Sequence, residues 1–178
     1  VTAFSQETVL AFRVTRNGKA TGVADVRSRP RPDGRPGILI ETSRQSSLAV
    51  GAEVQGVLQT SRTWLDEYND TERIEVCATS AGRVHRVTAT PSGGFLRIEV
   101  ENSGLKSQLT SPLPADTLLL GDVNACIPLL EGGLPYPKVA TLNSISLRLT
   151  VSPVIDLGLS KQRIAGTAEV VRELSLRD

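Results

Sequence analysis

The side chains best suited to chemistry in this sequence are a single histidine and two cysteines. His85 is the only histidine, so a Ser-His-Asp or Cys-His catalytic site would have to include it. Cys77 is the nearest nucleophile along the chain. The alternation described below places His85 on an apolar face and Cys77 on a polar face of one sheet, which excludes a dyad between them. We therefore expect no catalytic residues and a non-enzymatic protein.

Metal and cofactor sites are not predicted either. One histidine and two distant cysteines do not make a structural zinc site, and the sequence contains no glycine-rich phosphate loop or nucleophile elbow. The sharpest polar cluster, Asp66-Glu67-Tyr68-Asn69-Asp70, has carboxylates and an amide that could bind calcium. Its spacing matches no EF-hand loop, so a plain turn is the favoured interpretation. We expect no metal and no cofactor.

The two cysteines leave two alternatives open. Cys77 and Cys126 could form a disulfide in an oxidising compartment, or they could be two buried thiols. The chain starts at Val1 and contains no methionine, which favours a processed start such as a removed export signal. We therefore expect a periplasmic or extracellular location.

Composition excludes several classes of partner. The 178 residues carry a formal net charge of +1 with scattered basic residues, so nucleic acid is not an expected partner. No apolar run approaches the roughly 20 residues that span a bilayer. A chain of this length is long enough for one hydrophobic core, and we expect a single domain over residues 1–178.

The elements that must position these residues are best seen between Glu72 and Glu101. Apolar and polar residues alternate there through three short stretches separated by turn-forming residues, a pattern typical of an antiparallel meander with one buried face. A two-residue turn at Ala81-Gly82 aligns apolar residues of the first two stretches. The predicted pairs are Ala78 with His85, Val76 with Val87, and Ile74 with Ala89.

The next hairpin of the meander is predicted with a four-residue loop from Pro91 to Gly94. That loop would pair Ala89 with Leu96 and Val87 with Ile98. Five charged residues then fall on the opposite, solvated face: Arg73, Glu75, Arg97, Glu99 and Glu101.

Asn17-Gly18, between two alternating segments, is a strong hairpin signal near the start of the chain. A strict two-residue turn would place Phe12 opposite Val23. A three-residue loop with a bulge would instead place Phe12 opposite Gly22. We favour the second register because it keeps one face apolar.

Between these hairpins and after the meander the pattern changes. Residues 28–37 combine prolines, glycines and arginines and are predicted as an exposed irregular loop. Residues 114–134 contain the one credible helical segment, near Ala115 to Glu131, with Asp116 or Asp122 as a possible N-cap. Residues 139–151 and 161–176 return to alternation, each predicted as one strand. The fold class is therefore all-β: an antiparallel meander forming a barrel or curved half-barrel with a short helical segment.

Two short motifs carry a resemblance to a known class of domains. The opening hairpin reads VTRNGKATG from Val14 to Gly22, and a later strand ends in Trp64-Leu65-Asp66. These motifs resemble exported bacterial domains built as long β-meanders, which are similar in architecture to the lipoprotein-carrier half-barrels. The resemblance implies a curved antiparallel sheet wrapped around short helices and brings no catalytic residues with it.

The functional expectation is a cell-envelope binding module that holds a small apolar or lipid-like ligand in the concave face of the sheet. The alternative is a structural or accessory subunit of an envelope protein complex, with strand edges or the loop from Arg29 to Arg35 as contact surfaces. The residues predicted to line the ligand site are Phe12, Val14, Trp64, Val76, Val87, Ile98, Leu119, Ile127 and Leu130.

Overall fold

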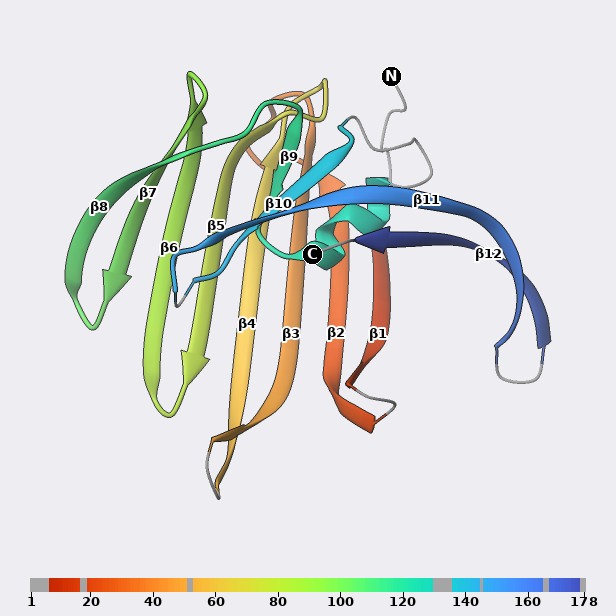
Figure 1. Cartoon of the computed structure of the whole chain (residues 1–178). Helices are drawn as coiled ribbons and strands as arrows, with labels where there is room; N and C mark the ends of the chain where they lie inside the picture. Colours follow the sequence, from red (N-terminus) through yellow and green to blue (C-terminus); the bar gives the residue numbers. More distant parts are fainter. Residues whose placement is uncertain are drawn as a thin grey trace.

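Two β-sheets make up the part of the chain that the computed structural model describes, namely residues 7–16, 19–50, 53–129, 136–144, 146–164 and 167–176. The larger sheet has eight strands in sequence order, all antiparallel (Figure 1). Its strands are β1 (Thr8–Arg16), β2 (Lys19–Pro30), β3 (Ile38–Val50), β4 (Glu53–Leu65), β5 (Thr71–Ser80), β6 (Arg83–Ser92), β7 (Phe95–Asn102) and β8 (Leu105–Pro112).

This sheet confirms the all-β class and the antiparallel meander. Its edges are β1 and β8, which are not hydrogen-bonded to each other in the described residues. Among the described strands the sheet is therefore open and forms no closed barrel.

The second sheet has four strands in the order β12-β11-β10-β9 and crosses in front of the larger sheet in Figure 1. The pair β9–β10 is parallel, and the short 3₁₀ helix η1 lies within the connection between them. The elements are β9 (Thr117–Leu120), η1 (Val123–Leu129), β10 (Lys138–Leu142), β11 (Leu149–Ile164) and β12 (Thr167–Leu176).

The helix predicted near Ala115 to Glu131 is thus a strand followed by one short helix. Leu118, Leu119 and Leu120 are each at most 1% exposed, because β9 is buried on both faces. A continuous apolar run of this kind is compatible with a buried strand as well as a helix. The proposed N-cap at Asp122 is confirmed, since its Oδ1 accepts a hydrogen bond from the Asn124 backbone N–H at 2.9 Å.

The two strands predicted at the end of the chain are instead parts of three. Residues 139–151 fold back on themselves, with Leu142 of β10 opposite Leu149 of β11. Residues 161–176 contain a second reversal, with Ile164 of β11 opposite Thr167 of β12.

The β5–β6 hairpin has the predicted register, with Ala78 opposite His85 and Val76 opposite Val87. The β6–β7 register was predicted incorrectly: Gly93-Gly94 form a two-residue turn, and Ala89 lies opposite Ile98. Both glycines have positive φ (56° and 80°), the conformation that tight hairpin turns require. The shift is two residues, so every side chain keeps its predicted face.

The β1–β2 hairpin follows neither of the two registers considered. Arg16 lies opposite Lys19, as in a two-residue turn, but a bulge after Val14 shifts the pairing so that Phe12 faces Ala24. The bulge adds one residue to β2 and brings apolar residues opposite one another.

The irregular loop predicted at residues 28–37 begins only after Pro30, where β2 ends. Arg31 within it is buried, with 7% relative exposure. Its guanidinium donates hydrogen bonds to the carboxylates of Asp33 and Glu72, each at 2.7 Å. Arg31 therefore ties the loop to β5 and is not available as a contact residue.

Among the residues whose side chains are described, the hydrophobic core lies between the two sheets and forms two clusters. One packs η1 and β9 on the β2–β4 side of the larger sheet; it includes Val26, Ile40, Leu65, Leu118 and Leu129. The other packs β9 and β10 on β5–β7; it includes Ile74, Val87, Ile98, Leu119 and Ala140.

Candidate functional site

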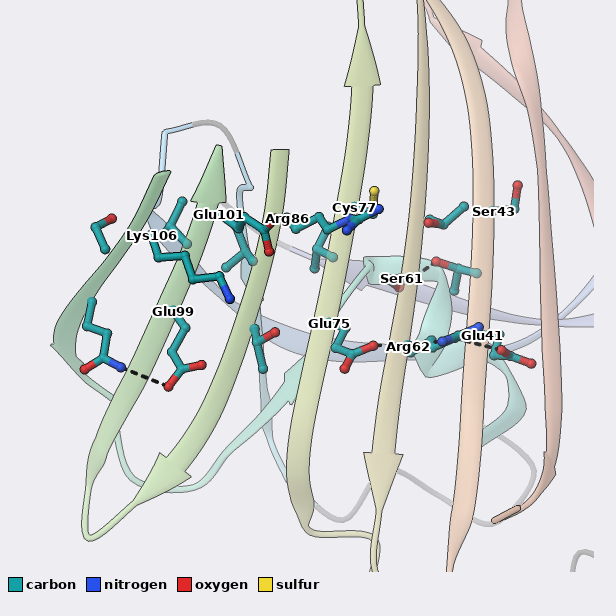
Figure 2. A pocket seen from close by; sticks show the side chains of 18 of the residues that line it. Glu41, Ser43, Ser61, Arg62, Glu75, Cys77, Arg86, Glu99, Glu101 and Lys106 are labelled. Carbon is teal, nitrogen blue, oxygen red and sulfur yellow. Dashed lines mark hydrogen bonds and ion pairs between the residues drawn. The ribbon is translucent and has the colours of Figure 1, made fainter. Parts of the chain in front are cut away.

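The opposite face of the larger sheet carries an open groove with a volume of about 760 Å³. It is lined by residues from β2 through β8, and η1 lies behind the sheet in this view (Figure 2). Alternation along β5 illustrates the two faces, since Ile74 and Val76 are buried in the core whereas Glu75 and Cys77 line the groove. The groove is thus formed by the solvated face of the sheet.

Four charges of alternating sign form a row across β2–β5, which we call the ion-paired row. The register places Arg27, Glu41, Arg62 and Glu75 opposite one another in that order. Arg62 lies between two carboxylates, at 3.1 Å from Glu41 and 4.0 Å from Glu75. Each exposed ion pair contributes little stability by itself. Arg27 is paired with Glu7 at 3.0 Å, so each charge of this row has a partner.

Glu99 of β7 extends the same row and also has bonding partners. It accepts a hydrogen bond from the amide of Gln108 on β8 at 3.1 Å. It also forms an ion pair with Arg97 at 3.4 Å.

The next row of side chains lies two residues along each strand from the ion-paired row. Its charged groups differ from those of the first row in their partners, and we call it the mixed row. It consists of Asp25, Ser43, Thr60, Cys77, Arg86, Glu101 and Lys106. Arg86, Glu101 and Lys106 are neighbours on β6, β7 and β8, yet no ion pair within 4.0 Å joins them to any other described residue. The β6–β8 end of the groove therefore holds charges without partners.

A third row borders the groove and is largely aliphatic. Val23, Leu58 and Val84 lie in one register with Gln45 and Thr79 between them. The three aliphatic side chains are 59%, 45% and 38% exposed, respectively. This aliphatic row lies about 7 Å from the mixed row, which is the distance spanned by two residues of a strand.

The residues predicted to line an apolar site lie mainly in the core. Val76, Val87, Ile98 and Leu119 are at most 1% exposed and pack between the sheets. Val76 and Val87 also border the groove, where alternation leaves only their backbone available.

The other predicted lining residues are dispersed. Ile127 is partly buried against the core cluster that includes η1. Trp64 lies outside the groove lining, with the Arg73 guanidinium 5.2 Å from its ring centroid. Leu130 and the side chains of Phe12 and Val14 fall outside the described part of the chain.

The cysteines are both free and lie in different environments. Cys77 is partly buried in the groove, opposite Arg86, and Figure 2 shows the two side chains next to each other. Cys126 is buried in the core, where burial raises the pKa of its thiol to about 11. His85 lies opposite Ala78 on the core-facing side, so Cys77 and His85 form no dyad.

The acidic segment from Asp66 to Asp70 forms the plain turn that was the favoured interpretation. Asp66 Oδ1 accepts hydrogen bonds from the backbone N–H groups of Tyr68 at 2.8 Å and Asp70 at 2.9 Å. The Asp70 carboxylate accepts a hydrogen bond from the Tyr136 hydroxyl, which raises the pKa of Tyr136 to about 12. In the described ranges no three His, Cys, Asp or Glu side chains are grouped to hold a metal ion.

Sequence reasoning identified the charged face but not the groove on it. The signal was present in the alternating signs of Arg27, Glu41, Arg62 and Glu75, but these residues become neighbours only once the three registers that join β2 to β5 are known.

Comparison with known protein families, with curated proteins and with solved structures found no match. Within the described residues, no helix is long and apolar enough to cross a membrane.

Proposed function

We propose that this protein is a non-enzymatic binding module whose ligand occupies the groove on the charged face of the larger sheet. The ligand class that fits the groove is a small, lipid-like amphiphile. Its charged headgroup would lie against the ion-paired and mixed rows, and its apolar part along the aliphatic row. The observation that supports this most directly is the ordered change from ion pairs to aliphatic side chains across three adjacent rows.

The apolar face offers less to a ligand. The side chains expected there, such as Val87 and Ile98, already make close contacts with the second sheet. Protein interiors packed in this way leave few voids larger than a water molecule. We therefore place the lipid-like ligand on the charged face of the larger sheet instead of the apolar face expected from the sequence.

Binding of lysophosphatidylethanolamine below its critical micelle concentration tests the proposal by isothermal titration calorimetry. Leu58→Gln should weaken binding, because it removes apolar area from the aliphatic row. Leu105→Gln is a matched control, since Leu105 is 79% exposed in the β7–β8 turn region and does not line the groove. Equal affinities for the wild type and both variants would argue against the proposed orientation, and absence of binding would argue against the ligand class.

A second candidate function, an accessory subunit of an envelope complex, is favoured by the open edge of the larger sheet. Residues 105–108 of β8 are exposed, and β8 pairs only with β7 among the described strands. An open edge presents unpaired backbone groups that can add a strand from another protein. Recovery of the protein only as a monomer from its native cell envelope would count against this candidate. The periplasmic or extracellular location itself stays a prediction.

A further inference from the structure

The two ends of the groove differ in how their charges are satisfied. At the β2–β5 end, Arg62 is neutralised by Glu41 at 3.1 Å and Glu75 at 4.0 Å. At the β6–β8 end, Arg86 and Lys106 have no carboxylate within 4.0 Å in the described part of the chain. Glu101 lies between them, so the charges without an ion pair at this end are two positive and one negative, while Glu99 is paired with Arg97 at 3.4 Å.

Arg86 is also shared between two hollows. Besides the main groove, it lines a smaller adjoining hollow of about 300 Å³ at the ends of the β5–β6 and β7–β8 hairpins. Arg83 lines that hollow as well, together with Glu101 and the turn residues Gly82 and Gly104. Arg83 is two residues from His85 on β6, so alternation turns its side chain toward the core-facing side. Arg86 is therefore the basic side chain of the charged face that lines both hollows.

The register places these side chains within reach of one small anion. Arg86 on β6 and Lys106 on β8 are separated by one strand, so their Cα atoms are about 10 Å apart. In Figure 2 the Arg86 side chain extends toward Cys77 on β5, so it would turn toward β8 to share one anion with Lys106, and both side chains are long enough for this. A guanidinium binds carboxylate and phosphate oxygens with two parallel hydrogen bonds, and an ammonium acts as a point charge.

We propose that Arg86, assisted by Lys106, binds the anionic group of the ligand, a phosphate or a carboxylate. This inference rests on the proposed function, since it assigns one end of the same groove to the negatively charged part of the ligand. Glu101 lies between Arg86 and Lys106. Its carboxylate repels an anion, so it lowers the affinity of the site for the anionic group.

Titration of the full chain with inorganic phosphate at low ionic strength, followed by backbone amide NMR shifts, tests the site. Phosphate should shift the amides around Arg86 and the Ala81-Gly82 turn. Arg86→Gln should weaken binding about tenfold or more, because it removes charge-assisted hydrogen bonds. Glu101→Gln should have the opposite effect and strengthen binding, a result that general loss of structure would not produce.

Arg97→Gln is the matched control, because Arg97 lies on the same face but is paired with Glu99 at 3.4 Å. It should leave phosphate binding unchanged. The proposal is overturned if Arg86→Gln and Arg97→Gln have equal effects, if Glu101→Gln weakens binding, or if phosphate shifts no amide near Arg86.

A second titration, with lysophosphatidylglycerol, distinguishes a lipid headgroup from free phosphate. Tighter binding of the lipid than of phosphate, lost in Arg86→Gln, identifies a headgroup site; equal affinities identify a site for the free anion. If a lysophospholipid binds the wild type and Arg86→Gln equally well, the anion site is wrong while the proposed function stands.

Discussion

Cys77 lies directly opposite Arg86 in the β5–β6 ladder, and both side chains face the groove rather than the core. The neighbouring pair in the same ladder, Ala78 and His85, faces the other side. His85 follows the other face of the sheet because it is one residue away from Arg86 along β6. The neighbour of the Cys77 thiol across the ladder is therefore the Arg86 guanidinium and not the imidazole. This arrangement leaves Cys77 without a histidine as a general base on its own face of the sheet.

Reactivity should distinguish the two thiols. At pH 8, N-ethylmaleimide should modify Cys77 in the native protein, whereas Cys126 should stay unmodified because it is buried and its pKa is raised to about 11. Intact-mass measurement should show one added label in the native protein and two after unfolding without reductant. Two labels in the native protein would contradict the burial of Cys126, and none after unfolding would indicate a disulfide.

Truncating a core side chain should lower the free energy of unfolding much more than truncating a side chain on the exposed surface. Ile98 is 0% exposed between the sheets, and Ile98→Ala should lower the free energy of unfolding by about 2–5 kcal/mol. Thr90 is exposed on the other face, and Thr90→Ala should change it by less than about 0.5 kcal/mol. Urea denaturation measures both values. A small effect at Ile98 would show that the side chain lines a void instead of a packed core.

The β6–β7 turn can be checked through its glycines. Gly93 and Gly94 have φ values of 56° and 80°, a region that costs an L-residue about 1–2 kcal/mol. Gly93→Ala and Gly94→Ala should each destabilise the protein by about that amount in thermal or urea unfolding. A neutral result at both positions would instead support the four-residue loop predicted from the sequence.

The sequence was sufficient to predict the class and the faces of the sheet. In the β5–β6 hairpin it also predicted the register, because a two-residue turn at Ala81-Gly82 fixes which apolar residues lie opposite one another. The β6–β7 register was missed because shifts of two residues leave the same side chains on the same face. Hydrophobic pattern alone does not distinguish them, and the Gly93-Gly94 dipeptide was the signal that did.

Other features depended on tertiary contacts that a single sequence does not contain. The Leu118-Leu119-Leu120 run is a strand because β10 pairs with it from about twenty residues downstream. The groove has the same origin, since its rows combine residues from seven strands, β2 to β8. Arg31 was expected in an exposed loop because its burial depends on Glu72, which is distant in sequence.

The Arg31 cluster should make stability depend on pH in the acid range. The Asp33 carboxylate accepts hydrogen bonds from Arg31, which hold its pKa below the usual range. A carboxyl group whose pKa is lowered by folding contributes stability above its unfolded pKa, and this is lost as pH falls through the folded pKa. The free energy of unfolding should therefore fall below about pH 4, and Asp33→Asn should show a smaller fall. An identical acid-side slope in both proteins would contradict the role of this pair.

Protection of Cys77 by the ligand would show whether the charged groove is the ligand site. The rate of its modification by N-ethylmaleimide would be measured with increasing lysophosphatidylethanolamine, with the Leu58→Gln variant in parallel. We expect the ligand to slow modification of Cys77 in a saturable manner, and the variant to need more ligand for the same protection. If a bound ligand leaves the rate at Cys77 unchanged, it occupies another part of the molecule and the assignment of the groove is wrong.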